Sequence, residues 1–277
     1  MSPTKLKTCV VRNRVVAVQR LANRKDSRAA ITVLCRRLVL ESAQKGPPFD
    51  PKCYAHLRGV SEITEQPGLP TNGVLERKGS SFVIRINLDL PLMRKRFVSC
   101  HEVVHTFFEE AAQKYKLHAL GRNGQSSDEE SLCDLGAAEL LMPDSLVRKW
   151  MSGRAIDVAL VREASSVFNV SLQVASRRLV DCAEGQAAVV HWNGERGFGR
   201  IVHLIPHEYR KGLPPLFREA TPAIQQCYEK SIPVQLQLRW VGSARQEIIC
   251  ESIPLQRPSA VHDEIDGCVV LSVLRPV

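Results

Sequence analysis

The stretch RFVSCHEVVHTFFEE, residues Arg96–Glu110, contains two histidines four positions apart, His101 and His105, with Glu102 directly after the first. On a helix, side chains at positions i and i+4 project from the same face, so both imidazoles can reach one divalent metal ion. The intervening carboxylate can take the proton of a water that the ion activates as this water attacks a carbonyl. We therefore predict His101 and His105 as metal ligands and Glu102 as a general base. The alternative is an ordinary amphipathic helix with a surface-facing histidine pair, and a third ligand decides between the two.

A second acidic segment, ESLCD, begins at Glu130, 25 residues after His105. A carboxylate from a second helix would complete a His2Glu set and leave a fourth position open for water. Asp134, one helical turn later on the same face, could accept a hydrogen bond from the outer nitrogen of a ligand imidazole. The alternative for Glu130 is a solvated helix N-terminus, where it would join Asp128 and Glu129 in favouring the helix dipole. A His2Glu set suits zinc best, with Mn²⁺ as the second option.

Extended segments precede the histidine helix. The turn-forming run EQPGLPTNG is followed by residues 73–87, which indicate two short strands around a Lys-Gly turn. Val83, Ile84 and Ile86 are β-branched, as expected on a pleated surface. Helical spacing of apolar side chains predicts helices within residues 14–42 and over residues 129–141, 160–168 and 172–180.

The pattern changes from residue 185 onward. Five short β-like runs are separated by turns rich in Gly, Pro and Asn, and they cover residues 187–192, 199–205, 233–241, 246–254 and 268–275. We therefore place a domain boundary near residue 184.

Composition excludes some classes of protein. The 277 residues are 44% hydrophobic and 24% charged, and no apolar run approaches the roughly 18 residues of a membrane span. The basic N-terminus has no export signal, and the nine cysteines are scattered without CxxC pairs, so we expect reduced thiols in a cytoplasmic protein. The formal charge of +9 could attract nucleic acid or an acidic protein, although a basic charge balance is common in bacterial proteins without nucleic-acid contacts.

Four segments, in this order, resemble the ImmA/IrrE family of bacterial metallopeptidases: FVIRIN, RKRFVSCHEVVHTFF, ESLCDLGAAELLMP and VREASSVFNVSLQVASRRL. The resemblance covers residues 45–182. It implies a compact thermolysin-like (gluzincin) core and an intracellular peptidase that cuts a helix-turn-helix transcriptional repressor. It also implies that the third metal ligand is Glu130. Many members carry Asn at the position of Asp134, and aspartate suits the hydrogen-bonding role at least as well.

Together, the patterns and what the resemblance implies predict an α+β protein. Its parts would be an N-terminal helical segment (1–44), a mainly helical thermolysin-like zinc peptidase core with a small β-sheet (45–150), a helix-turn-helix-like segment (151–184) and a β-rich domain (185–277). The lengths of the two helices within residues 161–180 suit a DNA-binding motif, but packing on the core is favoured over DNA reading. Some relatives carry small-molecule sensor domains at the position of the β-rich domain. In this chain, the β-rich domain could act as a switch that opens or blocks the cleft of the peptidase core.

The predicted function is that of a zinc-dependent endopeptidase acting on a helix-turn-helix repressor to induce a stress or mobile-element response. The alternative is a non-catalytic, metal-stabilised regulator that binds a repressor or DNA, although such a scaffold would have no need of Glu102. A residue that stabilises the oxyanion is also expected, and the candidates are Tyr115, His118 and Arg122.

Overall fold

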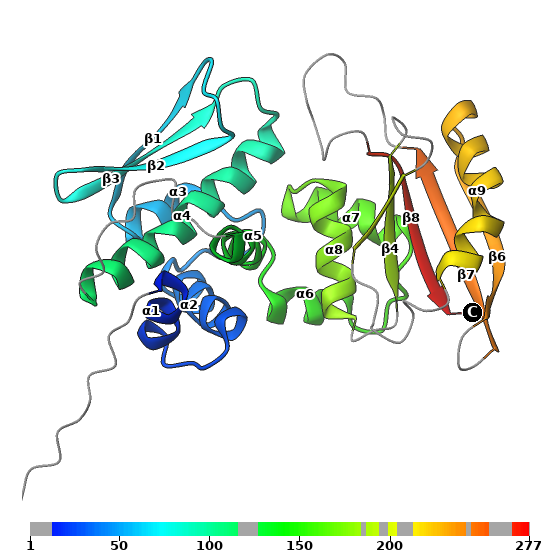
Figure 1. Cartoon of the computed structure of the whole chain (residues 1–277), viewed down its shortest axis with the longest axis horizontal. Coiled ribbons are helices and arrows are strands. Elements are labelled where there is room, and N and C mark those ends of the chain that lie inside the picture. Colours follow the sequence, from blue (N-terminus) through cyan, green and yellow to red (C-terminus); the bar gives the residue numbers. More distant parts are fainter. Residues whose placement is uncertain are drawn as a thin grey trace, which may run out of the picture. The chain divides into compact units, whose positions relative to one another are not determined.

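The chain has an α+β fold, as the sequence predicted. A computed structural model describes residues 13–115, 127–183, 187–193, 199–203, 213–241, 245–254 and 268–276. These residues form helices and two separate sheets (Figure 1). None of the helices within the described ranges has the length and hydrophobicity of a membrane span.

Contacts between Cα atoms divide the chain into two compact units. The first comprises Met1–Lys45, Phe49–Leu88 and Phe97–Leu141, and the second comprises Gly46–Pro48, Asp89–Arg96 and Met142–Val277. The domain limits at residues 44, 150 and 184 stay predictions.

The first unit opens with helices α1 (Arg14–Leu21), α2 (Ser27–Glu41) and α3 (Pro51–Leu57). Each follows a residue whose side chain accepts a hydrogen bond from a backbone N–H of the first turn, namely Asn13, Asp26 and Asp50. Such a cap satisfies a donor that has no partner within the helix. α3 also starts with a proline, which the first turn tolerates for the same reason.

A three-stranded sheet follows, made of β1 (Val60–Gln66), β2 (Gly73–Lys78) and β3 (Ser81–Asn87). β3 lies in the middle, parallel to β1 and antiparallel to β2. Gly79 has a φ of 63°, which a tight turn between β2 and β3 requires and which glycine adopts without strain. The strand pair expected over residues 73–87 is present, and β2 is an edge strand of this sheet.

Two long helices cross in the core of the first unit. α4 (Leu92–Lys114) carries the histidine motif, and α5 (Ser127–Leu141) carries the acidic segment. At Gly136 of α5, an added Cβ would lie 2.7 Å from Cγ2 of Val104 in α4. The two helices therefore approach closely because residue 136 has no side chain. Tyr54 of α3, fully buried, donates a 2.9 Å hydrogen bond to the carbonyl of Leu140 and ties α3 to α5.

The second unit begins with helices α6 (Asp144–Met151), α7 (Val158–Phe168) and α8 (Leu172–Cys182). Asn169 ends α7 in the left-handed conformation, and the Ser171 side chain caps α8, which gives the helix-turn-helix connection that the sequence indicated. Within α8, whose residues are all described, only Asp181 is exposed. The basic residue Arg178 is buried and donates to the Met142 carbonyl at 2.7 Å. α8 thus has little free surface with which to enter a DNA groove.

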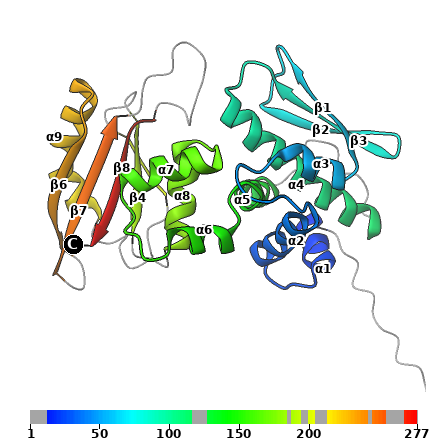
Figure 2. The same ribbon diagram turned by 180° about the vertical axis from the view of Figure 1, so that it is seen from behind.

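A five-stranded antiparallel sheet completes the second unit, in the order β5-β4-β8-β7-β6. Its strands are β4 (Ala188–Asn193), β5 (Gly199–His203), β6 (Val234–Val241), β7 (Arg245–Pro254) and β8 (Cys268–Pro276), one for each of the five expected runs. Seen from behind, α7 and α8 cover one face and α9 (Leu213–Lys230) covers the other (Figure 2). Sequence patterning does not predict α9, because this segment contains three prolines, one of them, Pro222, inside the helix.

Candidate metal centre

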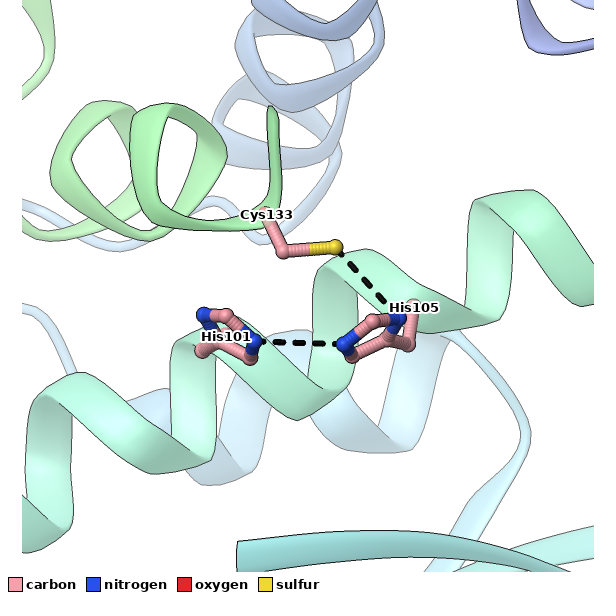
Figure 3. Close-up of side chains that lie close together, drawn as sticks. All are labelled: His101, His105 and Cys133. Carbon is pink, nitrogen blue, oxygen red and sulfur yellow. Dashed lines mark hydrogen bonds between the residues drawn. The ribbon is translucent and has the colours of Figure 1, made fainter. Parts of the chain in front are cut away.

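The two histidines of the motif face each other on one side of α4. Nε2 of His101 lies 3.1 Å from Nε2 of His105, and the ring centroids are 4.9 Å apart (Figure 3). This pairing follows from the four-residue spacing, which stacks the two side chains one turn apart. His105 is buried and His101 is half-buried, so the pair lies where the helix surface meets the core of the first unit.

Glu130 reaches this pair from α5. Its Oε2 lies 3.1 Å from Nε2 of His101, and its Oε1 lies 3.5 Å from Nε2 of His105. Ligand atoms in a tetrahedral zinc site with bonds of about 2.0–2.1 Å are separated by about 3.3 Å. Distances of 3.1, 3.1 and 3.5 Å among the three side chains therefore fit a single zinc ion. The Glu130 side chain is 45% exposed, which leaves this side of the set accessible to water.

The outer nitrogens of both imidazoles also have acidic partners. Nδ1 of His101 lies 2.9 Å from Oδ1 of Asp134, the residue expected to orient a ligand histidine. Nδ1 of His105 lies 3.2 Å from Oε1 of Glu129, which is buried. A carboxylate at this position accepts the Nδ1 proton and leaves Nε2 free to bind a metal ion.

Sequence reasoning assigned Glu129 only to the helix dipole and missed this contact. A signal was present, because Glu129 starts the stripe of buried side chains along α5, at the spacing of a helix face turned to the core. The stripe continues with Leu132, Cys133, Gly136, Ala137, Leu140 and Leu141.

Cys133 offers a second candidate ligand. His101, His105 and Cys133 have donor atoms within 4.8 Å of one another, and the three side chains could hold a metal ion (Figure 3). However, the Cys133 Sγ lies 3.4 Å from Nδ1 of His105, the ring nitrogen that does not face His101. Burial also raises the pKa of the Cys133 thiol, and the nearby Glu129 carboxylate raises it further, which disfavours the thiolate. The set formed by the two Nε2 atoms and Glu130 is therefore the better match for one ion.

Glu102 is buried beside the histidines and lies against β2. Its carboxylate accepts a hydrogen bond from the backbone N–H of Leu75. An added Cβ at Gly73 would clash with Cγ1 of Val98 and lie 3.1 Å from Oε1 of Glu102, so glycine allows the β2 backbone to approach α4 beside this carboxylate. Burial raises the pKa of Glu102, and the two imidazoles lower it by less. A carboxylate with a raised pKa is better suited to accept and return a proton near neutral pH.

Of the three oxyanion candidates, Tyr115 is the one that the structure describes, and it lies away from this site. Tyr115 follows the end of α4, about 15 Å along the helix axis from His105 at 1.5 Å per residue. His118 and Arg122 lie outside the described residues.

Metal binding is expected to weaken as the pH falls. Burial alone would lower the pKa of His101, but the hydrogen bonds to Asp134 and Glu130 outweigh it and raise the pKa to about 9. An ion must displace this proton, so each pH unit below 9 is expected to weaken Zn²⁺ binding by about tenfold. Competition with a chelator of known affinity between pH 6 and pH 9 measures this slope, and a flat profile would contradict the prediction.

In the metal-free protein, the stabilisation from the His101 proton is complete below the ordinary pKa of 6.5 and is lost as the pH rises through 9.

Comparisons with known proteins point to one family. Residues 62–180 match the sequence model of Peptidase_M78, described as an IrrE N-terminal-like domain. A Mycobacterium tuberculosis protein described as a transcriptional regulator has a similar fold, with a TM-score of 0.60 and 10% identity over 95% of this chain and 79% of that chain. The sequence matches no curated protein. Residues 62–180, which include all the motif side chains described above, are an IrrE N-terminal-like domain of the Peptidase_M78 family, as the resemblance to the ImmA/IrrE family predicted.

Proposed function

We propose that the chain is a zinc-dependent endopeptidase that cleaves a helix-turn-helix transcriptional repressor in the cytoplasm. The observation that carries this proposal is the 3.1–3.5 Å spacing of His101, His105 and Glu130, with the buried carboxylate of Glu102 directly after His101 in the sequence. Membership of the Peptidase_M78 family supports the same activity.

In this proposal, Nε2 of His101, Nε2 of His105 and the Glu130 carboxylate hold the ion. When bound, a zinc ion supplies a Lewis acid that polarises a peptide carbonyl and makes a water molecule acidic. Glu102 accepts a proton from the attacking water and returns it to the departing amine, because its burial favours the protonated carboxyl. Asp134 and Glu129 hold the two rings in the tautomer that presents Nε2.

The repressor substrate is proposed from the family and from the similarity of fold to a protein described as a transcriptional regulator. Direct DNA binding is less well supported, because α8 is packed against its neighbours and Arg178 is buried. A non-catalytic regulator could hold the same ion through the same ligands. It would gain nothing from a carboxylate with a raised pKa beside them, so we favour the peptidase.

Metal removal tests the proposal. The purified chain is incubated with each helix-turn-helix repressor encoded near its gene, and the fragments are identified by mass spectrometry. We expect cleavage of one repressor at one or a few bonds, loss of this cleavage after chelation, and its return when Zn²⁺ is added in excess of the chelator. Fragments that persist after chelation, or intact repressors under every condition, would contradict the proposed activity.

A further inference from the structure

An arginine from the N-terminal helix reaches the carboxylate behind His105. Arg14, the first residue of α1, places its Nε 3.0 Å from Oε2 of Glu129 and donates from NH2 to Oε1 of the same carboxylate at 3.1 Å. The same NH2 donates to Oε1 of Glu109 in α4 at 2.8 Å. α1 lies outside residues 62–180, so the match to the family model does not include this contact.

Burial makes the contact important for the site. The Glu129 side chain is 2% exposed and the Arg14 side chain is 15% exposed. A buried carboxylate that lost its cation would be strongly destabilised, and its side chain would move. The Arg14 guanidinium, which contacts both carboxylate oxygens of Glu129, instead fixes the orientation of this carboxylate. The orientation matters here because Oε1 of Glu129 is also 3.2 Å from Nδ1 of His105.

We infer that Arg14 is a positioning residue for the metal centre, acting on His105 through Glu129. The guanidinium holds the carboxylate so that it accepts the Nδ1 proton of His105, and this contact presents Nε2 to the ion together with His101 and Glu130. Packing of α1 is therefore coupled to metal affinity. The inference rests on the metal site of the proposed function and extends it to a helix that the family match does not cover.

The chain contains a matched control for this contact. Arg36 of α2 contacts Glu139 of α5 with Nε 3.2 Å from Oε1, and the Glu139 side chain is 1% exposed. Both pairs thus join a helix from the N-terminal region to a buried glutamate on α5. Glu139 lies ten residues after Glu129, about 15 Å further along the helix, so removal of Arg36 tests the effect on the fold without the effect on His105.

The test compares Arg14→Met and Arg36→Met in the full chain. Zn²⁺ affinity is measured by chelator competition, the absorption bands of bound Co²⁺ report the ligand geometry, and thermal unfolding of the metal-free proteins reports stability. Both variants are expected to unfold at lower temperature than the wild type. Only Arg14→Met is expected to bind Zn²⁺ about 10- to 100-fold more weakly, the range found when an outer partner of a ligand histidine is lost, and to change the Co²⁺ bands.

The inference is wrong if Arg14→Met binds Zn²⁺ within about twofold of the wild type, or if Arg36→Met weakens binding to the same degree. Should Arg14→Met fail to fold, Glu129→Gln keeps the shape of the side chain and is expected to weaken Zn²⁺ binding in the same range. These measurements need no substrate. The wild type and Arg36→Met could bind Zn²⁺ more tightly than Arg14→Met while the wild type cleaves no repressor. This result would refute the peptidase proposal and leave the role of Arg14 intact.

Discussion

Glu102→Gln is expected to slow repressor cleavage by about 10²- to 10⁴-fold, the usual contribution of a general base. The amide oxygen can still accept the hydrogen bond from Leu75, and the side chain keeps its shape against Gly73. It cannot accept a proton from water, so the chemical step loses its base. Because Glu102 is not in the proposed ligand set, Zn²⁺ affinity should stay close to that of the wild type.

A glutamate on the same helix provides the control. Glu110 is exposed, pairs with Arg58 and is not among the side chains of the proposed metal site. Glu110→Gln removes one negative charge from α4 and should leave the cleavage rate within about twofold of the wild type, as surface ion pairs contribute little. Equal fragment yields from the wild type and Glu102→Gln would show that Glu102 is not the base. If Glu102→Gln and Glu110→Gln lowered the cleavage rate equally, the cause would be a general effect of the charge on α4.

Glu130→Gln is expected to weaken Zn²⁺ binding by more than about 100-fold, beyond the effect of losing an outer partner. A neutral amide is a poor ligand for zinc, and the substitution also removes the charge that opposes the ion. The hydrogen bond to His101 lowers the pKa of Glu130, so the carboxylate is ionised and ready to bind. Cleavage should be lost together with the metal.

Cys133→Ser decides between the two candidate third ligands. Serine keeps a small polar group beside Nδ1 of His105 and removes the sulfur. If Glu130 is the ligand, Cys133→Ser should bind Zn²⁺ within about threefold of the wild type, since the His2Glu set stays complete. The opposite ranking, with metal lost from Cys133→Ser and retained by Glu130→Gln, would assign the site to the thiol. Isothermal titration with Zn²⁺ after complete chelation measures both variants under the same conditions.

The sequence predicts the parts of this site that depend on local geometry. His101 and His105 are one turn apart on a single helix, so their convergence follows from helix geometry alone. Glu130 and Asp134 are related in the same way on α5. The contact of Glu129 with His105 depends on how α4 and α5 cross and on α1, which supplies Arg14 from 115 residues away. No local sequence pattern indicates a contact between residues so far apart in the chain.

The same distinction applies to the second unit. The β-branched runs from residue 187 onward predict five strands because each strand needs only its own alternation and turns. Their order does not follow from these runs, since β8 lies between β4 and β7 through pairings of distant segments. Helix α9 shows that prolines in a segment do not always prevent a helix. Its first two prolines fall in the opening turn, where they are tolerated, and packing on the sheet overrides the third.

Gly136 carries a consequence for the evolution of this domain. A methyl group there would press into both Cγ atoms of Val104 and into the Cys35 sulfur. Homologues with the same proposed ligand set should therefore either retain glycine at this position or carry a smaller residue in place of the opposing valine. Covariation between these two positions would then record, across species, how tightly the helices that bear the ligands must be held together.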